Sequence, residues 1–273
     1  MRRALRIAPC GLCAAGAAAV IGLLALPASG AGTTGPTTRT SLTVYLVRGE
    51  HLSPVRRVVP RTTGVAAAAL RALLRGPTSA ERTAGYGTTV PAGTALRGVS
   101  ISGRVATVDL TRRYESGGGS LSMLLRVAQV VYTATQFPTV DRVAFRLDGK
   151  SAEAIGGEGV IVAPPVGRRG FEGQAPAILV ERPLPNDLVG NPVRVSGSAN
   201  VFEAQLAVDL LDARGRRIAR RYVMATAGTG TRGTFAVSIA VPQTARVRFV
   251  VAYTNSPKDG SPINVVRVPV RGR

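Results

Sequence analysis

The chain has 273 residues, 45% of which are hydrophobic, so it is long enough for two domains with apolar cores. It contains no tryptophan and only 4% aromatic residues, so those cores must consist mainly of aliphatic side chains. The formal net charge is +20, and arginine carries nearly all of the positive charge because lysine occurs only at Lys150 and Lys258. A basic surface favours polyanions, but the sequence has no zinc-finger spacing, aromatic ribonucleoprotein motif or regularly spaced basic helix, which argues against nucleic acid as the partner.

Residues 1–31 have the pattern of a secretory signal peptide. Arg2 and Arg3 make the start basic, an apolar stretch of small residues follows, and residues 27–31 are small enough for cleavage after Ala31. The alternative is an uncleaved membrane anchor, although the apolar stretch is slightly shorter than the roughly 20 residues of a spanning helix. We therefore expect a secreted or otherwise extracytoplasmic protein, in contact with the membrane only if the signal is retained.

Both cysteines of the chain, Cys10 and Cys13, lie inside this segment. The mature protein would have none, which excludes disulfides, thiol catalysis and cysteine-ligated metals. Residues 32–41 are polar and rich in threonine and glycine, and we interpret them as a tether.

An α+β domain is predicted over residues 42–165, in the order β-β-α-β-β-α-β, with two helices on a mixed or antiparallel sheet. Alternating apolar residues predict its strands, and apolar residues spaced by three and four predict its helices. The expected strands are 42–47, 52–60, 96–102, 105–110 and 142–147, with a last short strand at 160–162, and the helices follow Thr62 or Thr63 and Ser120 as N-caps.

The second helix has the clearest pattern in the chain. Its apolar stripe consists of Leu121, Leu124, Leu125, Ala128, Val131 and Tyr132. Arg126 and Gln129 lie off this stripe. The helix should end near Phe137, because Pro138 disfavours helical angles in the residue before it.

The glycine-rich residues 166–176 are interpreted as a linker to a second domain at 177–271. Helical periodicity disappears there, and short alternating stretches are separated by turn signals such as Asn191-Pro192 and Asp259-Gly260. The expected strands are 178–181, 193–198, 204–211, 217–224, 234–240, 247–253 and 265–270. Seven strands at this spacing predict an all-β antiparallel sandwich.

Two sets of short motifs follow one another along the chain. The first set is 44–46, 72–77, 108–110, 136–140 and 147–150, and the second is 183–187, 191–199, 201–204 and 256–260. On the first set, the α+β domain resembles the GerM-type sporulation and spore germination domain. On the second set, the following domain resembles the immunoglobulin-like domain of bacterial spore germination proteins. The resemblance implies a non-enzymatic, extracytoplasmic module of Gram-positive envelopes, and self-association into homo-oligomers.

The sequence predicts no catalytic, metal or cofactor site. His51 is the only histidine and has no partner in the sequence pattern, so we interpret it as a surface-loop residue. Asp109, Asp141 and Asp148 could form a hydrolytic pair, but strand and turn roles explain them better. Residues 117–119 lack the Lys-Ser/Thr that a nucleotide-binding loop needs, so they are interpreted as a helix entry.

The basic clusters are the remaining candidates for binding. Arg112, Arg113 and Tyr114 form one cluster, Arg168 and Arg169 a second, and a third lies at 216–221. The first two are the predicted contacts for an anion or partner.

We therefore expect an exported, non-catalytic binding or scaffold protein of the cell envelope. Its expected partner is a cell-wall polymer or an envelope protein, with no cofactor. Two alternatives stay open, a cell-wall hydrolase and a carbohydrate-binding module, and the second is weakened by the absence of tryptophan.

Overall fold

The structure is a computed structural model that describes residues 38–157 and 159–272. The predicted signal peptide and its cleavage after Ala31 lie outside these residues. Thr37–Arg273 forms one compact unit. The first strand, β1 (Arg39–Arg48), begins before the predicted tether at 32–41 ends, so the last three tether residues belong to the fold.

A long hairpin starts the described chain. β1 pairs along its whole length with β2 (His51–Pro60), antiparallel, through the turn at Gly49, whose φ of 61° suits glycine. The short β3 (Tyr86–Gly87) pairs with β1 only at Val47 and Arg48. Between β2 and β3 lie α1 (Val65–Leu74) and the short α2 (Ser79–Thr83), which begins with a capping box.

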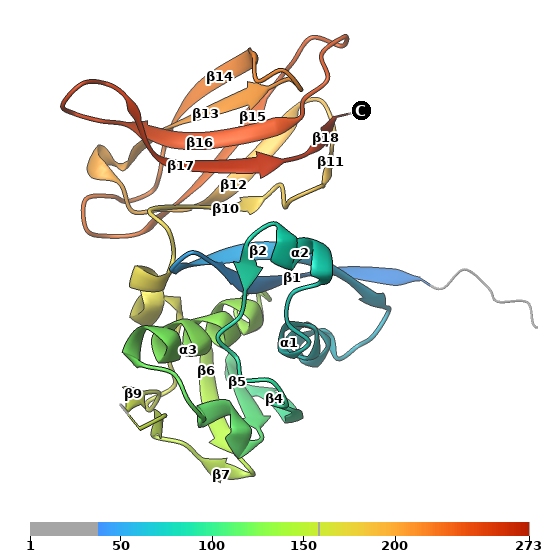
Figure 1. The fold of residues 1–273 in the computed structure, drawn as a ribbon, viewed down its shortest axis with the longest axis vertical. Coiled ribbons are helices and arrows are strands. Elements are labelled where there is room, and N and C mark those ends of the chain that lie inside the picture. The colour runs from blue at the N-terminus through green and yellow to red at the C-terminus, as the bar shows by residue number, and fades with distance from the viewer. Residues whose placement is uncertain (1–37, 158, 273) are drawn as a thin grey trace, which may run out of the picture. The chain divides into compact units, whose positions relative to one another are not determined.

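A second sheet contains β4 (Leu96–Ser102), β5 (Val105–Leu110), β6 (Arg142–Leu147) and β7 (Lys150–Ser151), in that order. β5 and β6 are parallel, and the chain crosses between them through η1 (Arg112–Glu115) and α3 (Ser120–Ala134). The pair β8 (Ala154–Ile155) and β9 (Val160–Ile161) follows. The first region is thus mixed α/β with few helices, but its strands form separate sheets instead of the single sheet that we predicted (Figure 1).

Helix α3 is buried on almost every side. It contacts β1, β2, α1 and η2 (Arg168–Gln174), and also β6 and β9. Arg126 and Gln129, which lie off the predicted apolar stripe, are therefore buried as well, 2% and 0% exposed. A stripe predicts only the face that one neighbour covers, and α3 has neighbours on several faces.

Both helices begin at glycine instead of at the predicted hydroxyl residues. The N-cap of α3 is Gly119, and Ser120 is its first helical residue. The N-cap of α1 is Gly64, whose amide donates to the Thr62 hydroxyl (3.1 Å). The threonine therefore stabilises the turn before the helix and not the helix end itself.

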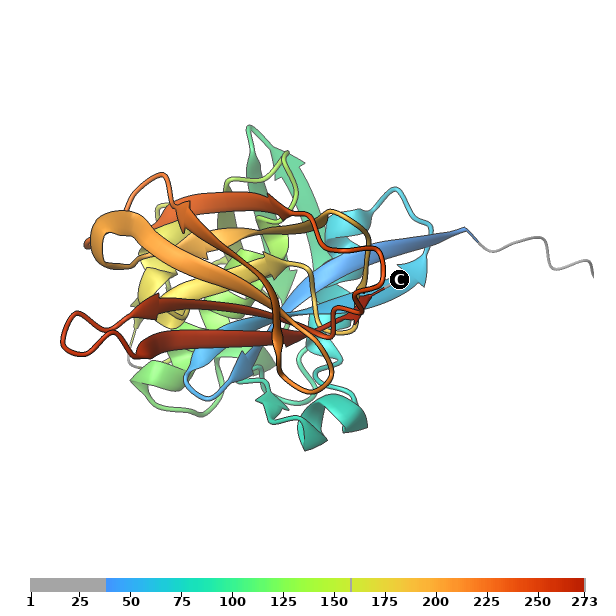
Figure 2. The same ribbon diagram turned by 90° about the horizontal axis from the view of Figure 1, so that it is seen from above.

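The second region is rich in sheet, with η3 (Phe202–Ala204) as a short helical turn. One sheet has the order β10-β12-β15 and the other β14-β13-β16-β17, and the small pair β11 with β18 is parallel. β16 and β17 lie side by side as an antiparallel pair (Figure 2). Its strands are β10 (Ile178–Arg182), β11 (Leu188–Val189), β12 (Val193–Ala199), β13 (Gln205–Leu211), β14 (Arg217–Met224), β15 (Gly233–Ile239), β16 (Phe249–Asn255), β17 (Pro262–Pro269) and β18 (Arg271–Gly272).

Buried apolar residues from both sheets form one core. Ile178, Val195 and Phe235 come from the first sheet, and Val208 and Val250 come from the second. Within residues 38–157 and 159–272, no helix is long and apolar enough to cross a membrane.

The predicted linker at 166–176 is largely structured. η2 spans Arg168–Gln174, and Phe171 is buried in the core of the first region. Leu179 of β10 belongs to the same core. The end of the first region and the start of the second therefore share apolar packing.

Candidate functional site

A polar cluster joins β1, η2 and β10. Arg168 donates to Glu181 Oε1 over 2.7 Å, and the Tyr45 hydroxyl donates to the same carboxylate oxygen. The Arg168 guanidinium also lies 4.7 Å from the ring centre of Tyr132. Burial and the nearby Glu181 charge raise the pKa of Tyr45, so the hydroxyl stays protonated as a donor. The cluster fixes the start of the second region against the first.

Two adjoining pockets lie beside this cluster, where β1, β3 and α2 face β17 and the loop before β11. Their volumes are about 210 and 450 Å³, and both are lined by Arg48, Tyr86 and Arg267. His51 lines the smaller pocket and Phe249 the larger one. These five residues define what we call the junction groove.

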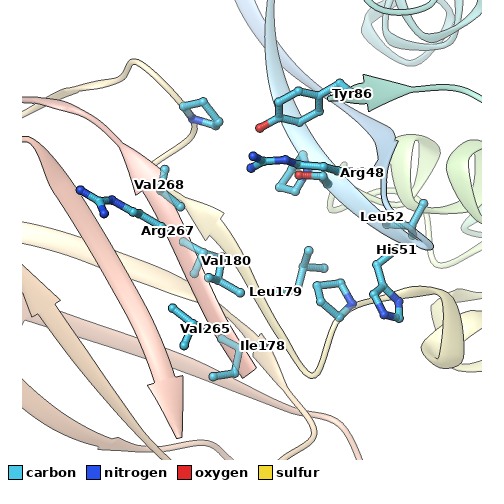
Figure 3. Close-up of a pocket in the computed structure, with 15 residues that line it drawn as sticks. Arg48, His51, Leu52, Tyr86, Ile178, Leu179, Val180, Val265, Arg267 and Val268 are labelled. Atoms are coloured by element: carbon cyan, nitrogen blue, oxygen red, sulfur yellow. The ribbon is translucent and has the colours of Figure 1, made fainter. Parts of the chain in front are cut away.

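The arginines of the junction groove lie on its two sides. Arg48 extends from the end of β1 with Tyr86 beside it, and Arg267 lies on β17 (Figure 3). Each guanidinium packs over an aromatic ring, with 5.5 Å from Arg48 to the Tyr86 ring centre and 3.7 Å from Arg267 to that of Phe249. Stacking of this kind holds a cation in place without neutralising it.

Two acidic residues near the groove, Glu81 and Asp187, are already paired. Both Glu81 oxygens accept from Arg57, at 2.6 and 2.8 Å, and one of them also accepts from the Thr78 amide. Burial alone would raise the pKa of Glu81, but these hydrogen bonds lower it, so the carboxylate is held ionised in this pair. Asp187 accepts from Arg56 over 2.9 Å.

Arg48 and Arg267 differ from these pairs. Among the residues that the structure describes, neither forms an ion pair with a carboxylate. The junction groove therefore carries uncompensated positive charge beside aromatic faces, which suits an anionic ligand.

The predicted contacts at 112–114 do not form one surface. Arg112 and Arg113 are exposed, but Tyr114 is fully buried, stacks on Phe145 and donates to the Arg126 carbonyl over 3.0 Å. Tyr114 cannot contact a partner in this structure, which corrects the prediction for that residue. A tyrosine after two arginines has no apolar periodicity around it, so its burial left no signal in the sequence.

The two residues of the predicted pair Arg168 and Arg169 also lie in different surroundings. Arg168 belongs to the polar cluster with Glu181, whereas Arg169 is exposed. In the third basic cluster, Arg220 binds Asp209 through two hydrogen bonds of 2.7 and 2.8 Å, and Arg216 binds Asp212 over 2.8 Å. Several of the clustered arginines thus bind carboxylates of the same chain and stabilise the fold.

The three aspartates of the central stretch also have structural partners. Asp109 accepts from the Gly149 amide (3.0 Å), and Asp148 accepts from the Arg112 amide (3.3 Å). Asp141 binds Arg104 with two hydrogen bonds, and these lower the pKa of its carboxyl. Asp109 and Asp148 lie near one another, because Arg97 is within ion-pair distance of both, at 3.6 and 3.7 Å, and this arginine balances their charge.

His51 opens β2, is exposed and lines the smaller pocket of the junction groove. Within the described ranges, no group of three or more histidine, cysteine, aspartate or glutamate side chains is arranged to hold a metal ion.

The sequence pattern did not indicate Arg48 or Arg267 as binding residues. They are isolated in the sequence, and each adjoins ordinary strand residues, so nothing in their local pattern sets them apart. Only the packing of β3 and β17 near the end of β1 brings them together.

Comparison with protein families finds two matches, in the predicted order. Residues 43–153 match the family described as sporulation and spore germination. Residues 177–261 match the immunoglobulin-like domain of bacterial spore germination. Both predicted resemblances are confirmed. No curated protein matches the chain at a significant level.

Solved structures are similar as well. The tandem GerMN domains of the sporulation protein GerM from Bacillus subtilis share 16% identity, with a TM-score of 0.45 over 86% of this chain; the chain spans 61% of the length of that structure. The first GerMN domain of the same protein shares 23% identity, with a TM-score of 0.40, over 48% of this chain and 98% of that one. A putative lipoprotein from Clostridium perfringens shares 16% identity, with a TM-score of 0.37, over 50% of this chain and 92% of that one.

Proposed function

We propose that this chain, a sporulation- and germination-related protein that joins a sporulation and spore germination domain to an immunoglobulin-like domain, is a non-catalytic binding or scaffold protein of the cell envelope. The predicted signal peptide supports a position outside the cytoplasm. The expected partner is a wall polymer or an envelope protein, and self-association remains part of the proposal.

The observation that carries the proposal is that both matched regions contribute to one basic groove. Arg48 and Tyr86 come from the first match, and Phe249 comes from the second. The bond between Arg168 and Glu181 holds the regions together at that point. We further propose that the two sheets of the second region close as an antiparallel sandwich, a rigid support for the groove.

Retention on envelope fractions tests the proposal. The full chain, with its signal removed by the exporting cell, should bind to purified cell wall, to envelope membranes or to both, and crosslinking in intact cells should capture an envelope component. A protein that passes through both fractions unbound contradicts the proposed role. Turnover of labelled peptidoglycan that is abolished by Asp109→Asn would instead favour a hydrolase.

A further inference from the structure

We infer that the junction groove binds a soluble polyol-phosphate chain, with successive phosphodiesters engaged by Arg48 and Arg267. This inference rests on the proposed binding function and adds the ligand class and the residues that contact it. Three features of the groove support it: its free cations, its paired acids and its aromatic walls.

The first feature is the pair of cations. The guanidinium carbons of Arg48 and Arg267 each lie over an aromatic ring, 5.5 and 3.7 Å from its centre, and neither side chain forms an ion pair with a carboxylate among the described residues. A guanidinium that stacks through its flat face keeps its N–H groups free at the edge. These edges can donate paired hydrogen bonds to the non-bridging oxygens of a phosphodiester.

The second feature is the state of the nearby acids. Glu81 lines the larger pocket, but Arg57 and the Thr78 amide occupy its oxygens. Asp187, next to the lining residue Asn186, is bound by Arg56. An incoming anion would therefore meet carboxylates whose charge is already balanced, and its repulsion from them is small.

The third feature is the aromatic wall beside two separated arginines, and it favours a polymer with linked phosphates over a single anion. The two arginines come from opposite sides of the groove, so a lone phosphate would engage them less well than two linked phosphates. The same pocket is also lined by Tyr86, Phe249 and Pro185, apolar surfaces on which the carbon skeleton of a polyol can pack. A volume of about 450 Å³ accommodates a few such units.

The test compares variants of the full exported chain in binding to soluble poly(glycerol phosphate). Arg48→Gln and Arg267→Gln should each weaken binding roughly tenfold, because each removes a charge-assisted contact. Arg194→Gln is the matched control, since Arg194 is exposed on β12 and has no ion pair among the described residues. Unchanged melting temperatures would show that the groove variants are folded.

Three results would overturn the inference. Groove variants that bind the polymer as well as Arg194→Gln would place the ligand elsewhere. Equal, arginine-dependent binding of polyglutamate would show that phosphate is not recognised. Arginine-dependent binding to phosphatidylglycerol vesicles without binding to the soluble polymer would identify a lipid headgroup as the phosphate source.

The same variants separate this inference from the function that it rests on. If the chain is retained on cell wall and the double variant Arg48→Gln/Arg267→Gln is retained equally, the groove inference is wrong while the binding function stands. If neither protein is retained on wall or membrane, the proposed function itself is wrong.

Discussion

Arg126 shows how a charged side chain in the middle of a helix can be a core residue. Its guanidinium donates to the backbone carbonyls of Tyr114 (2.7 Å), Ser116 (3.2 Å) and Gly117 (2.8 Å), and its Nε donates to Thr89 (2.8 Å). Burial lowers its pKa, although arginine still keeps its proton at any ordinary pH. One side chain thus satisfies the carbonyls of two loops that have no sheet partner.

Replacing Arg126 with methionine should therefore destabilise the protein strongly. We expect a loss of about 3 kcal/mol in the free energy of unfolding, because four hydrogen bonds to backbone carbonyls are removed together. Urea unfolding measures the loss. The control Arg113→Met alters an exposed arginine and should change stability by no more than about 0.5 kcal/mol. Equal midpoints for the two variants would contradict the structural role of Arg126.

Buried tyrosines predict a stability that falls in alkali. Burial raises the pKa of Tyr45, Tyr114 and Tyr132 above the ordinary value of about 10. The unfolded chain loses these protons near pH 10 while the folded chain keeps them. Their contribution is therefore complete below about pH 10 and is lost as the pH rises above it, by up to about 1.4 kcal/mol per pH unit for each tyrosine.

Urea unfolding between about pH 9 and 11 measures this slope. Tyr114→Phe removes one titrating group and should make the decline shallower, whereas Tyr222→Phe, at an exposed position, should leave it unchanged. A Tyr114→Phe variant with the same alkaline slope as the parent would show that Tyr114 ionises freely in the folded protein.

At the scale of the elements, α3 takes the place of a strand beside β1. The Thr133 hydroxyl accepts from the Tyr45 amide (3.2 Å), and Gln129 donates to the Tyr45 carbonyl (2.9 Å). Two residues earlier on β1, the Gln136 side chain forms the same two kinds of hydrogen bond. It accepts from the Thr43 amide (2.9 Å) and donates to the Thr43 carbonyl (2.6 Å). Side chains three and four residues apart, at positions 129, 133 and 136, thus form hydrogen bonds with the backbone of alternate residues of β1, Thr43 and Tyr45.

Removing one of these side chains should loosen β1 locally. Thr133→Val keeps the shape of the side chain but leaves the Tyr45 amide without its acceptor, which costs about 1–3 kcal/mol. Hydrogen exchange at the Tyr45 amide should accelerate at least roughly tenfold. The exposed Thr244→Val is the control. If exchange at Tyr45 were the same in both variants, the bond to Thr133 would not protect the strand.

The elements near α3 also show what the sequence could predict. The start and approximate end of the helix follow from its periodicity and from Pro138, and the helix does run over Ser120–Ala134. The burial of Arg126 and Gln129 does not follow, because it depends on loops and strands that approach α3 from distant parts of the chain. The same limit applies to the candidate site, since Arg48 and Arg267 meet only through tertiary packing.

At the scale of the whole described chain, the two regions depend on one another through Arg168 and Glu181. Their side chains are 29% and 26% exposed, so the pair is only partly screened by water. The adjacent Arg169 is exposed, and among the described residues its side chain forms no hydrogen bond or ion pair. Neighbouring arginines therefore offer a matched test of the junction.

We expect Arg168→Met to lower the stability of the junction by about 2 kcal/mol, because Glu181 keeps only the Tyr45 hydroxyl as a partner. Calorimetry should show an earlier or divided melting transition for this variant, and a parent-like transition for Arg169→Met. Superimposable melting curves for the two variants would mean that other contacts hold the regions together.

The way in which α3 covers β1 has a consequence for how copies of the protein could aggregate. An open strand edge presents unpaired backbone amides and carbonyls, so an extended segment from another molecule can dock along it. Such docking is blocked beside Thr43 and Tyr45. Glutamine and threonine side chains already form hydrogen bonds with the backbone amides and carbonyls to which an added strand would have to bind. A neighbouring copy could reach this edge only by displacing the most deeply buried helix of the fold, so crowding at a surface should leave the hairpin intact.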